Sequence, residues 1–116
     1  MKIKRGDIVL VRLDPTEGSE QRGERPSVVL SPDIINENSP VVIVAAITSK
    51  KIDKIYPFEV FLEPSECSLK EKSKALLLHI RSIDKKRILK KYGTLSVATM
   101  EKINEALSIA IGLKEL

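Results

Sequence analysis

Short apolar stretches with a period of two dominate the first two thirds of the chain. Alternation of apolar and polar residues predicts half-buried strands, and proline, which cannot join a central ladder, marks where strands stop. Turn residues or prolines bound most of these stretches. The stretches are Ile8–Leu13, Ser27–Ser31, Val41–Thr48, Phe58–Leu62 and Ala75–Ile80.

The stretch 41–47 differs from the others because it is apolar on both faces and rich in β-branched residues. Such a run predicts a central strand that is covered on both sides. It is also the longest apolar run, and a bilayer requires about 20 such residues. We therefore expect no membrane association and a soluble, cytoplasmic protein.

The apolar period changes from two to 3.6 near the C-terminus, which predicts a helix that packs on the strands. Ser96 is a suitable N-cap and Gly112 a suitable C-cap. The expected fold is a mainly β single domain, residues 1–116, that forms a small barrel or curled sheet with a C-terminal helix. The apolar stripe consists of Val97, Met100, Ile103, Leu107, Ala110 and Ile111.

Cysteine and histidine counts limit the possible chemistry. The 116 residues include one Cys and one His, so an intrachain disulfide and a Cys/His metal cluster are excluded. We expect no metal and no cofactor.

Basic residues are unevenly distributed along the chain. The net charge is +4, but residues 67–94 alone contain nine basic and two acidic residues, whereas residues 26–66 contain three and six. Such asymmetry is typical of a surface that meets phosphates or an acidic partner. A solvated lysine face explains the same pattern, and charge alone leaves both interpretations open.

A polar loop at 17–26 separates the first two predicted strands and contains Gly18 and Gly23. The two glycines permit tight turns that present Glu20 and Arg25, a carboxylate and a guanidinium, from one loop. By itself this is a weak signal, because a charged loop of this length is more often a solvated connection.

An ordered set of short motifs covers nearly the whole chain. In order, they are Gly6-Asp7, Asp14-Pro15-Thr16, Gly18-Ser19-Glu20-Gln21, Arg25-Pro26, Ala46-Ile47-Thr48-Ser49, Tyr56-Pro57-Phe58-Glu59-Val60, Ile80-Arg81-Ser82-Ile83 and Gly112-Leu113. Together they resemble the MazF/PemK (Kid) toxins, the RNA-cleaving halves of toxin-antitoxin pairs.

The resemblance implies a homodimeric SH3-like barrel of the CcdB/PemK type. We expect unpaired apolar surface on the first strand and the terminal helix to supply the dimer contact. It implies a metal-independent endoribonuclease that cuts single-stranded RNA, often mRNA, and leaves a 2′,3′-cyclic phosphate and a 5′-OH. It also implies a cognate antitoxin, whose acidic, disordered tail would cover the basic stretch, and a toxin-antitoxin complex that binds DNA.

The resemblance also implies a role for individual residues. Arg25 carries the catalytic guanidinium, which presents a planar set of donors to phosphate oxygens. Thr48 carries the catalytic hydroxyl, and Glu20 is the nearest candidate for the base or an orienting carboxylate. We expect Ser19, Gln21 and Ser49 to contact the substrate.

The only histidine, His79, lies where members of this family commonly carry Gln. It is either a structural residue or a group that contacts a base or transfers a second proton. Arg81, Lys85 and Lys86 are predicted to bind RNA phosphates. Aromatic residues are scarce, so we expect base recognition to rely on hydrogen bonds. They are Tyr56, Phe58, Phe61 and Tyr92.

Two alternatives share the predicted fold. A CcdB-type gyrase poison ends in Trp-Gly-Ile, whereas this chain contains no Trp. A non-catalytic RNA-binding barrel would keep the basic stretch but would need neither Arg25 nor Thr48.

Overall fold

A computed structural model describes residues 1–13 and 23–116. The predicted site residues Ser19, Glu20 and Gln21 lie outside the described residues. The described chain forms one antiparallel sheet with the strand order β4-β5-β3-β2-β1-β6. The strands are β1 (Asp7–Leu13), β2 (Gly23–Val29), β3 (Val41–Thr48), β4 (Glu59–Leu62), β5 (Ser73–Asp84) and β6 (Ile88–Thr94).

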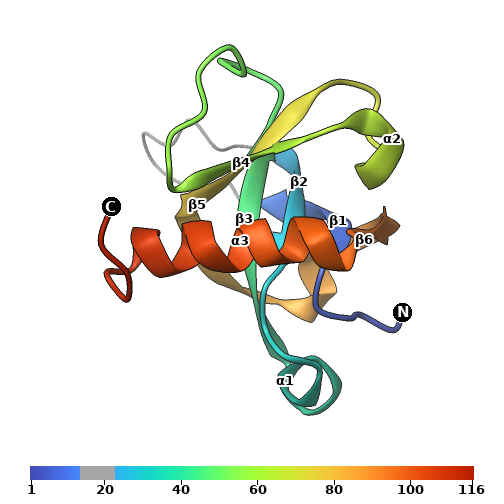
Figure 1. The fold of residues 1–116 in the computed structure, drawn as a ribbon. Helices are drawn as coiled ribbons and strands as arrows, with labels where there is room; N and C mark the ends of the chain where they lie inside the picture. The colour runs from blue at the N-terminus through green and yellow to red at the C-terminus, as the bar shows by residue number, and fades with distance from the viewer. Residues whose placement is uncertain (14–22) are drawn as a thin grey trace.

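In residues 1–13 and 23–116, three helices and a short 3-10 turn complete the fold. The sheet curls, α3 crosses one of its faces, and α1 extends from one end of the molecule while α2 lies near the other (Figure 1). No helix in the described part of the chain is long and apolar enough to cross a membrane. The helices are α1 (Asp33–Asn38), α2 (Pro64–Cys67) and α3 (Val97–Ala110), and the 3-10 turn η1 is Lys85–Arg87.

Two cores lie on the two faces of the sheet because successive side chains of a strand point to opposite sides. In β1, Ile8 contributes to the core beneath α3, whereas Val9 and Val11 contribute to the second core inside the curl. From α3, Ile103 and Ala106 enter the first core. The predicted packing of the terminal helix on the strands is confirmed.

The predicted caps of α3 are found with one refinement. The hydroxyl oxygen of Ser96 accepts a hydrogen bond from the backbone N–H of Thr99 at 3.2 Å, as expected of an N-cap. The C-cap is Ile111, and Gly112 follows it with φ of +81°. Gly112 therefore supplies the left-handed residue just after the cap.

The prediction for the central strand is right for only part of β3. Ala45 and Ile47 are buried beneath α3, but Val41 and Ile43, on the same face, are about 40% exposed. The structure thus leaves the first half of this face uncovered, although Val42 and Val44 on the opposite face are buried.

The prediction placed the start of β2 too late. The strand begins at Gly23 and includes Pro26, whereas the prediction treated this proline as its boundary. Pro26 lies opposite Leu10 of β1, but the ladder with β3 begins only at Ser27. The proline therefore occupies a segment paired on one side only, where a missing N–H is tolerated.

The other differences lie in polar segments. β5 continues to Asp84, and β6, α1 and α2 were not predicted. β6 carries two lysines and pairs with β1, so tertiary pairing rather than an apolar pattern makes it a strand. Each of the two unpredicted helices is only four to six residues long, too short to show a helical period.

Candidate functional site

A pocket of about 320 Å³ opens where β2 and β3 separate, and both Arg25 and Thr48 line it. The printed ladder pairs Ser27 with Ala46. Continued by two residues, this register places Arg25 opposite Thr48 on the same face of the sheet. The structure thus brings together the two residues that were predicted to be catalytic. Ser49 also lines the pocket.

Arg25 is positioned by β1. It pairs with Val11, whose side chain is fully buried in the second core, and its own side chain is half-buried. A strand residue with a well-packed neighbour has little backbone freedom, so the guanidinium enters the pocket from a rigid support.

Thr48 is the last residue of β3, and its hydroxyl bonds the backbone just after the strand. Its Oγ1 accepts a hydrogen bond from the backbone N–H of Lys50 at 3.1 Å. A hydroxyl has one proton and two acceptor positions, so this contact leaves the proton available for a phosphate oxygen or a ribose hydroxyl. Thr48 is half-buried, which keeps it accessible from the pocket.

Four charged residues of the pocket were not among the predicted site residues. Lys50 and Lys70 add cationic groups, and Glu24 and Glu71 add carboxylates. Together with Arg25, they give the described part of the lining one more positive than negative group. Lys50 and Glu24 directly adjoin predicted site residues in the sequence, and this adjacency was the available signal. Lys70 and Glu71 precede β5 and reach the pocket only through tertiary structure.

A buried ion pair supports the site next to Thr48. In the β3–β5 ladder Thr48 lies opposite Lys74, whose Nζ is 2.8 Å from Oε1 of Glu59. The two side chains are only 6% and 10% exposed. The same ammonium donates to the backbone oxygen of Lys54 at 3.1 Å. These contacts join β4, β5 and the segment before β4 on the face that carries Thr48.

His79 and Arg81 lie elsewhere on β5. Both are exposed and line a shallow hollow with Leu78, Ile80 and Ser82. Among the residues that the structure describes, this hollow shares no lining residue with the Arg25 pocket. Within one chain, the structure therefore does not join them to Arg25 and Thr48. Their predicted contacts with RNA stay predictions.

Lys85 and Lys86 also lie outside the pocket. The Lys85 ammonium donates to the backbone oxygen of Asn36 at 2.6 Å and so ties η1 to α1. Lys86 lines a small hollow with Arg12 and Asp84. Lys85 thus has a structural contact that the sequence did not indicate, and the predicted phosphate contacts of both lysines stay predictions.

Among residues 1–13 and 23–116, no three His, Cys, Asp or Glu side chains come together in a group that could hold a metal ion.

The fold and the pocket define a small, mainly β protein whose curled sheet carries a site suited to a phosphate group. The family model of the PemK-like, MazF-like toxins of type II toxin-antitoxin systems matches residues 4–111. The chain therefore belongs to this family, as the motifs predicted.

Similar proteins agree with this assignment. The chain is 42% identical over 111 residues to Endoribonuclease MazF of Staphylococcus saprophyticus. The aligned residues cover 96% of this chain and 92% of the relative. The crystal structure of MazF from Deinococcus radiodurans is 28% identical, with a TM-score of 0.78, and covers 97% of this chain and 98% of that one. The predicted enzyme class, an endoribonuclease, and the predicted mainly β fold with a C-terminal helix are confirmed.

A further structural neighbour contains an antitoxin. An endoribonuclease in complex with its cognate antitoxin, from a mycobacterial species, has a TM-score of 0.80 at 24% identity and covers 98% of this chain and 99% of that chain. At this identity the likeness concerns the fold.

Proposed function

We propose that this toxin cleaves single-stranded RNA, including mRNA, without a metal ion, in the pocket that contains Arg25 and Thr48. The observation that carries the proposal is the convergence of a guanidinium and a hydroxyl at the open end of the β2–β3 ladder. Lys50 and Lys70 on the same lining favour a polyanionic strand.

The proposed reaction is an internal displacement at phosphorus. The ribose 2′-oxygen attacks the adjacent phosphorus and forms a new O–P bond, while the bond to the 5′-oxygen breaks. A base takes the proton of the 2′-OH, and the departing 5′-oxygen takes up a proton. The products are a 2′,3′-cyclic phosphate and a 5′-OH end.

Arg25 and Thr48 stabilise the charge that develops on the non-bridging oxygens. The guanidinium offers several donors in one plane and carries a positive charge. The Thr48 hydroxyl donates a further hydrogen bond, because the Lys50 N–H uses only one of its two acceptor positions and leaves its proton available. Hydrogen-bond donors that are already in place before the reaction make the largest single contribution to the rate enhancement of many enzymes.

The base is proposed to be a carboxylate. Glu20 remains the predicted candidate from the loop, and Glu24 is the carboxylate that lines the pocket beside Arg25. Comparing Glu20→Gln with Glu24→Gln separates them, because only the variant that lacks the base should lose most of its rate between pH 6 and 8.

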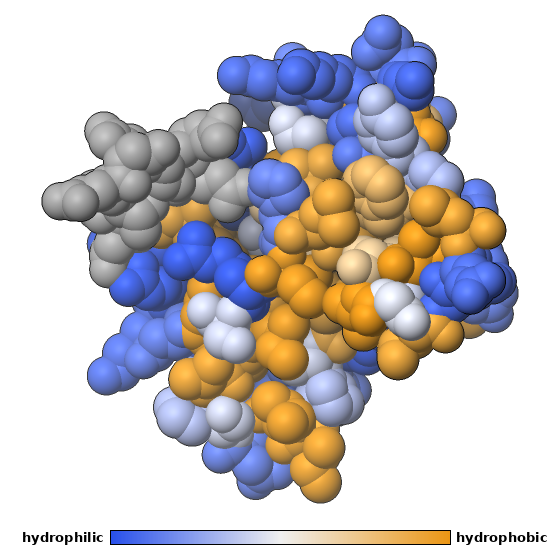
Figure 2. All heavy atoms as spheres, turned by 90° about the vertical axis from the view of Figure 1, so that its left-hand side faces the viewer, coloured by the Kyte–Doolittle hydropathy of each residue, from blue (hydrophilic) through white to orange (hydrophobic). Residues whose placement is uncertain are grey.

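A homodimer is proposed to form through an exposed apolar face. Figure 2 shows apolar side chains gathered in a broad band on the side of the molecule where α3 ends. The predicted contribution of β1 is wrong because β1 is central and its apolar residues contribute to the two cores. The exposed apolar residues include Ile34 of α1, Val41 and Ile43 of β3, Leu78 and Ile80 of β5, and Ile111 and Leu113 after α3.

An exposed apolar band on a small protein favours self-association. Leu78, which is 58% exposed, is a suitable position for testing whether this band forms the dimer contact. Leu78→Lys should convert a dimer into a monomer in sedimentation equilibrium, whereas Val97→Lys, on the exposed start of α3, should leave the dimer intact. A monomeric wild-type protein would contradict the proposed dimer.

The antitoxin is proposed to neutralise the enzyme with an acidic, disordered tail in the cytoplasm, where mRNA lies. The basic stretch 67–94 supplies the complementary charge, and the lysines at 86, 90 and 91 are exposed, whereas Lys85 is partly buried. A synthetic acidic peptide should therefore inhibit cleavage at low salt and lose this effect as the ionic strength rises.

The deciding experiment incubates the purified protein with a long single-stranded RNA in excess EDTA and maps the ends. We expect discrete cuts with 2′,3′-cyclic phosphate and 5′-OH ends. Products with 3′-OH ends would contradict the mechanism, and an absence of cuts across varied RNAs would contradict the enzymatic function.

A further inference from the structure

An exposed aromatic ring lies on the segment before β4, close to the lysine that pairs with Thr48 across the β3–β5 ladder. Tyr56 is 44% exposed although it is one of the few aromatic residues of the chain. A large ring left in water by a protein with little aromatic surface suggests a binding function rather than a role in the core.

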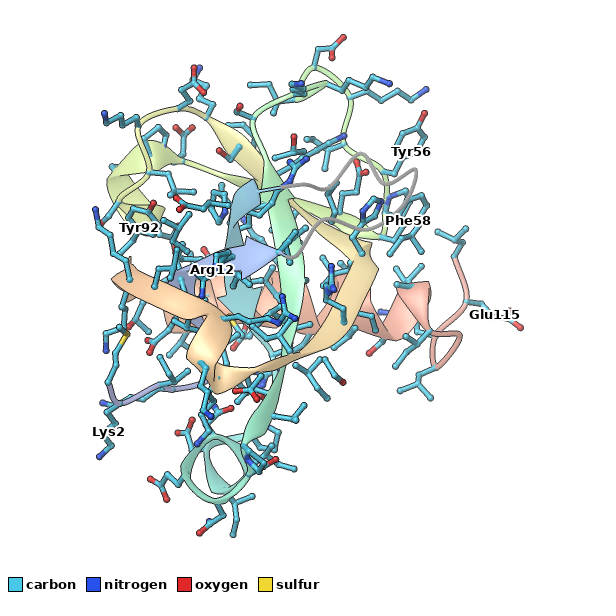
Figure 3. All side chains as sticks on the ribbon, turned by 180° about the vertical axis from the view of Figure 1, so that it is seen from behind. Lys2, Arg12, Tyr56, Phe58, Tyr92 and Glu115 are labelled. Carbon is cyan, nitrogen blue, oxygen red and sulfur yellow. The ribbon has the colours of Figure 1, made fainter. Side chains whose placement is uncertain are left out.

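The ring is held by a stack and by hydrogen bonds. Tyr56 and Phe58 stack with their centroids 5.5 Å apart and their planes only 3° from parallel. The backbone N–H of Tyr56 donates to Oε1 of Glu59 at 3.1 Å, and the Glu59 N–H donates back to the Tyr56 oxygen at 2.9 Å. Figure 3 shows the two rings next to each other on the segment before β4. The platform is therefore preorganised.

Tyr56 lies on the same side of the sheet as Thr48. Residues paired directly across an antiparallel ladder share a face, and Thr48 is paired with Lys74. The Lys74 ammonium lies 6.0 Å from the centre of the Tyr56 ring. A single lysine side chain thus spans the distance from the strand next to Thr48 to the aromatic platform.

A second cation lies over the same ring. The Nζ of exposed Lys54 is 5.1 Å from the centre of Tyr56. An exposed ammonium on an aromatic face is held only weakly. An incoming nucleobase can displace it, and the ammonium then lies where it can bind the phosphate of the same nucleotide.

We propose that Tyr56, supported by Phe58, stacks on a nucleobase that flanks the scissile phosphate, with Lys54 moving from the ring to the backbone phosphate. This subsite rests on the proposed function and names how one base is held. It adds a stacking contact to the expected recognition of bases by hydrogen bonds. Stacking accepts any base, so Tyr56 strengthens binding at one position, and sequence preference comes from other contacts.

The test measures binding rather than cleavage. A fluorescent oligonucleotide with 2′-O-methyl groups has no free nucleophile, and its affinity is read by anisotropy. It carries the sequence that the protein cuts, or poly(U) and poly(A) are used if no cut site is found. Tyr56→Ala should weaken binding by about 5- to 150-fold, and Tyr56→Leu should resemble it. Tyr56→Phe and Tyr56→Trp should bind like the wild type.

Abasic substitution identifies the stacked base. Replacing one base at a time with an abasic ribose should weaken wild-type binding strongly at one flanking position, and Tyr56→Ala should be insensitive at that position. Lys54→Ala should lower the slope of log affinity against log salt by about 1. Thermal unfolding of each variant should match the wild type, because Tyr56 is outside both cores.

Equal affinity of Tyr56→Ala and the wild type, or equal sensitivity of both to every abasic position, would overturn the proposal. Failure of the proposed function has a different signature: unmodified RNA would remain uncut although Tyr56-dependent binding persisted.

Discussion

Arg25 and Thr48 come from two different strands and line one pocket at the point where the ladder between those strands opens. The two residues are far apart in the sequence. The register of β2 against β3 alone determines that a guanidinium and a hydroxyl face the same space. A shift of one residue would send one of the two side chains to the opposite face.

Removal of either group should slow cleavage without unfolding the protein. Arg25→Ala and Thr48→Ala should each lower the single-turnover rate on the order of 10²-fold or more, by analogy with removal of an oxyanion donor. Thr48→Ser keeps the hydroxyl and should retain most of the rate. Full activity of both alanine variants, with unchanged thermal unfolding, would place the site elsewhere.

Breaking the buried ion pair should lower the free energy of unfolding substantially. Glu59→Ala leaves the ammonium of Lys74, which is 6% exposed, without its carboxylate. We expect the free energy of unfolding in urea to fall by about 3 kcal/mol. The double variant Glu59→Leu/Lys74→Met removes both charges and should recover most of that loss. If Glu59→Ala were as stable as the wild type, the pair would have no structural role.

Glu66 should make stability depend on pH in the acid range. Its carboxylate accepts hydrogen bonds from the hydroxyl of Ser96 at 2.5 Å and from the Ser96 N–H at 3.1 Å, joining α2 to the start of α3. The Ser96 hydroxyl is the main cause that lowers the pKa of Glu66 below its ordinary value of 4.5.

Because the folded state holds the proton less tightly than the unfolded state, the stabilisation is complete above the ordinary pKa of Glu66. It is lost as pH falls through the lower folded value. Urea unfolding should show Glu66→Gln less stable than the wild type at pH 7, by less than about 1 kcal/mol, with the difference shrinking below pH 4.5. Glu101→Gln, on the exposed face of α3, should show a smaller difference. A constant gap from pH 7 to 3 would contradict this role.

Two neighbouring lysines should differ in what they stabilise. Lys85 donates to the backbone oxygen of Asn36, whereas the Lys86 side chain lies in an open hollow. Lys85→Met should lower the free energy of unfolding by about 1–2 kcal/mol, because it leaves that carbonyl without its charged donor. Lys86→Met should leave stability unchanged, so the matched pair separates a structural lysine from a surface lysine. Equal effects would show that the α1 contact contributes nothing.

The local patterns were sufficient for the elements with strong apolar periods. β1, β3, β4 and α3 were predicted to within one or two residues, because alternation and helical stripes reflect which side chains the fold buries. The motif set also predicted the family and the enzyme class, which the family match and the relatives confirm.

Elements without a clear period could not be predicted in this way. β6 is a strand because β1 offers it hydrogen-bond partners, and the start of β2 extends through Pro26 because β3 does not pair there. A local pattern contains no information on which strand will lie alongside another.

For the site, the sequence by itself determined the residue types: a guanidinium, a hydroxyl, lysines for phosphates and a few aromatic rings. Only the tertiary structure decided which of them share a surface. Strand register joined Arg25 to Thr48 and separated His79 and Arg81 from them within one chain. The turn before β4 brought Tyr56 next to Lys74, which pairs with Thr48. The physical reason is that side-chain proximity across a sheet depends on pairing between distant segments, and this pairing is set by burial of the whole fold.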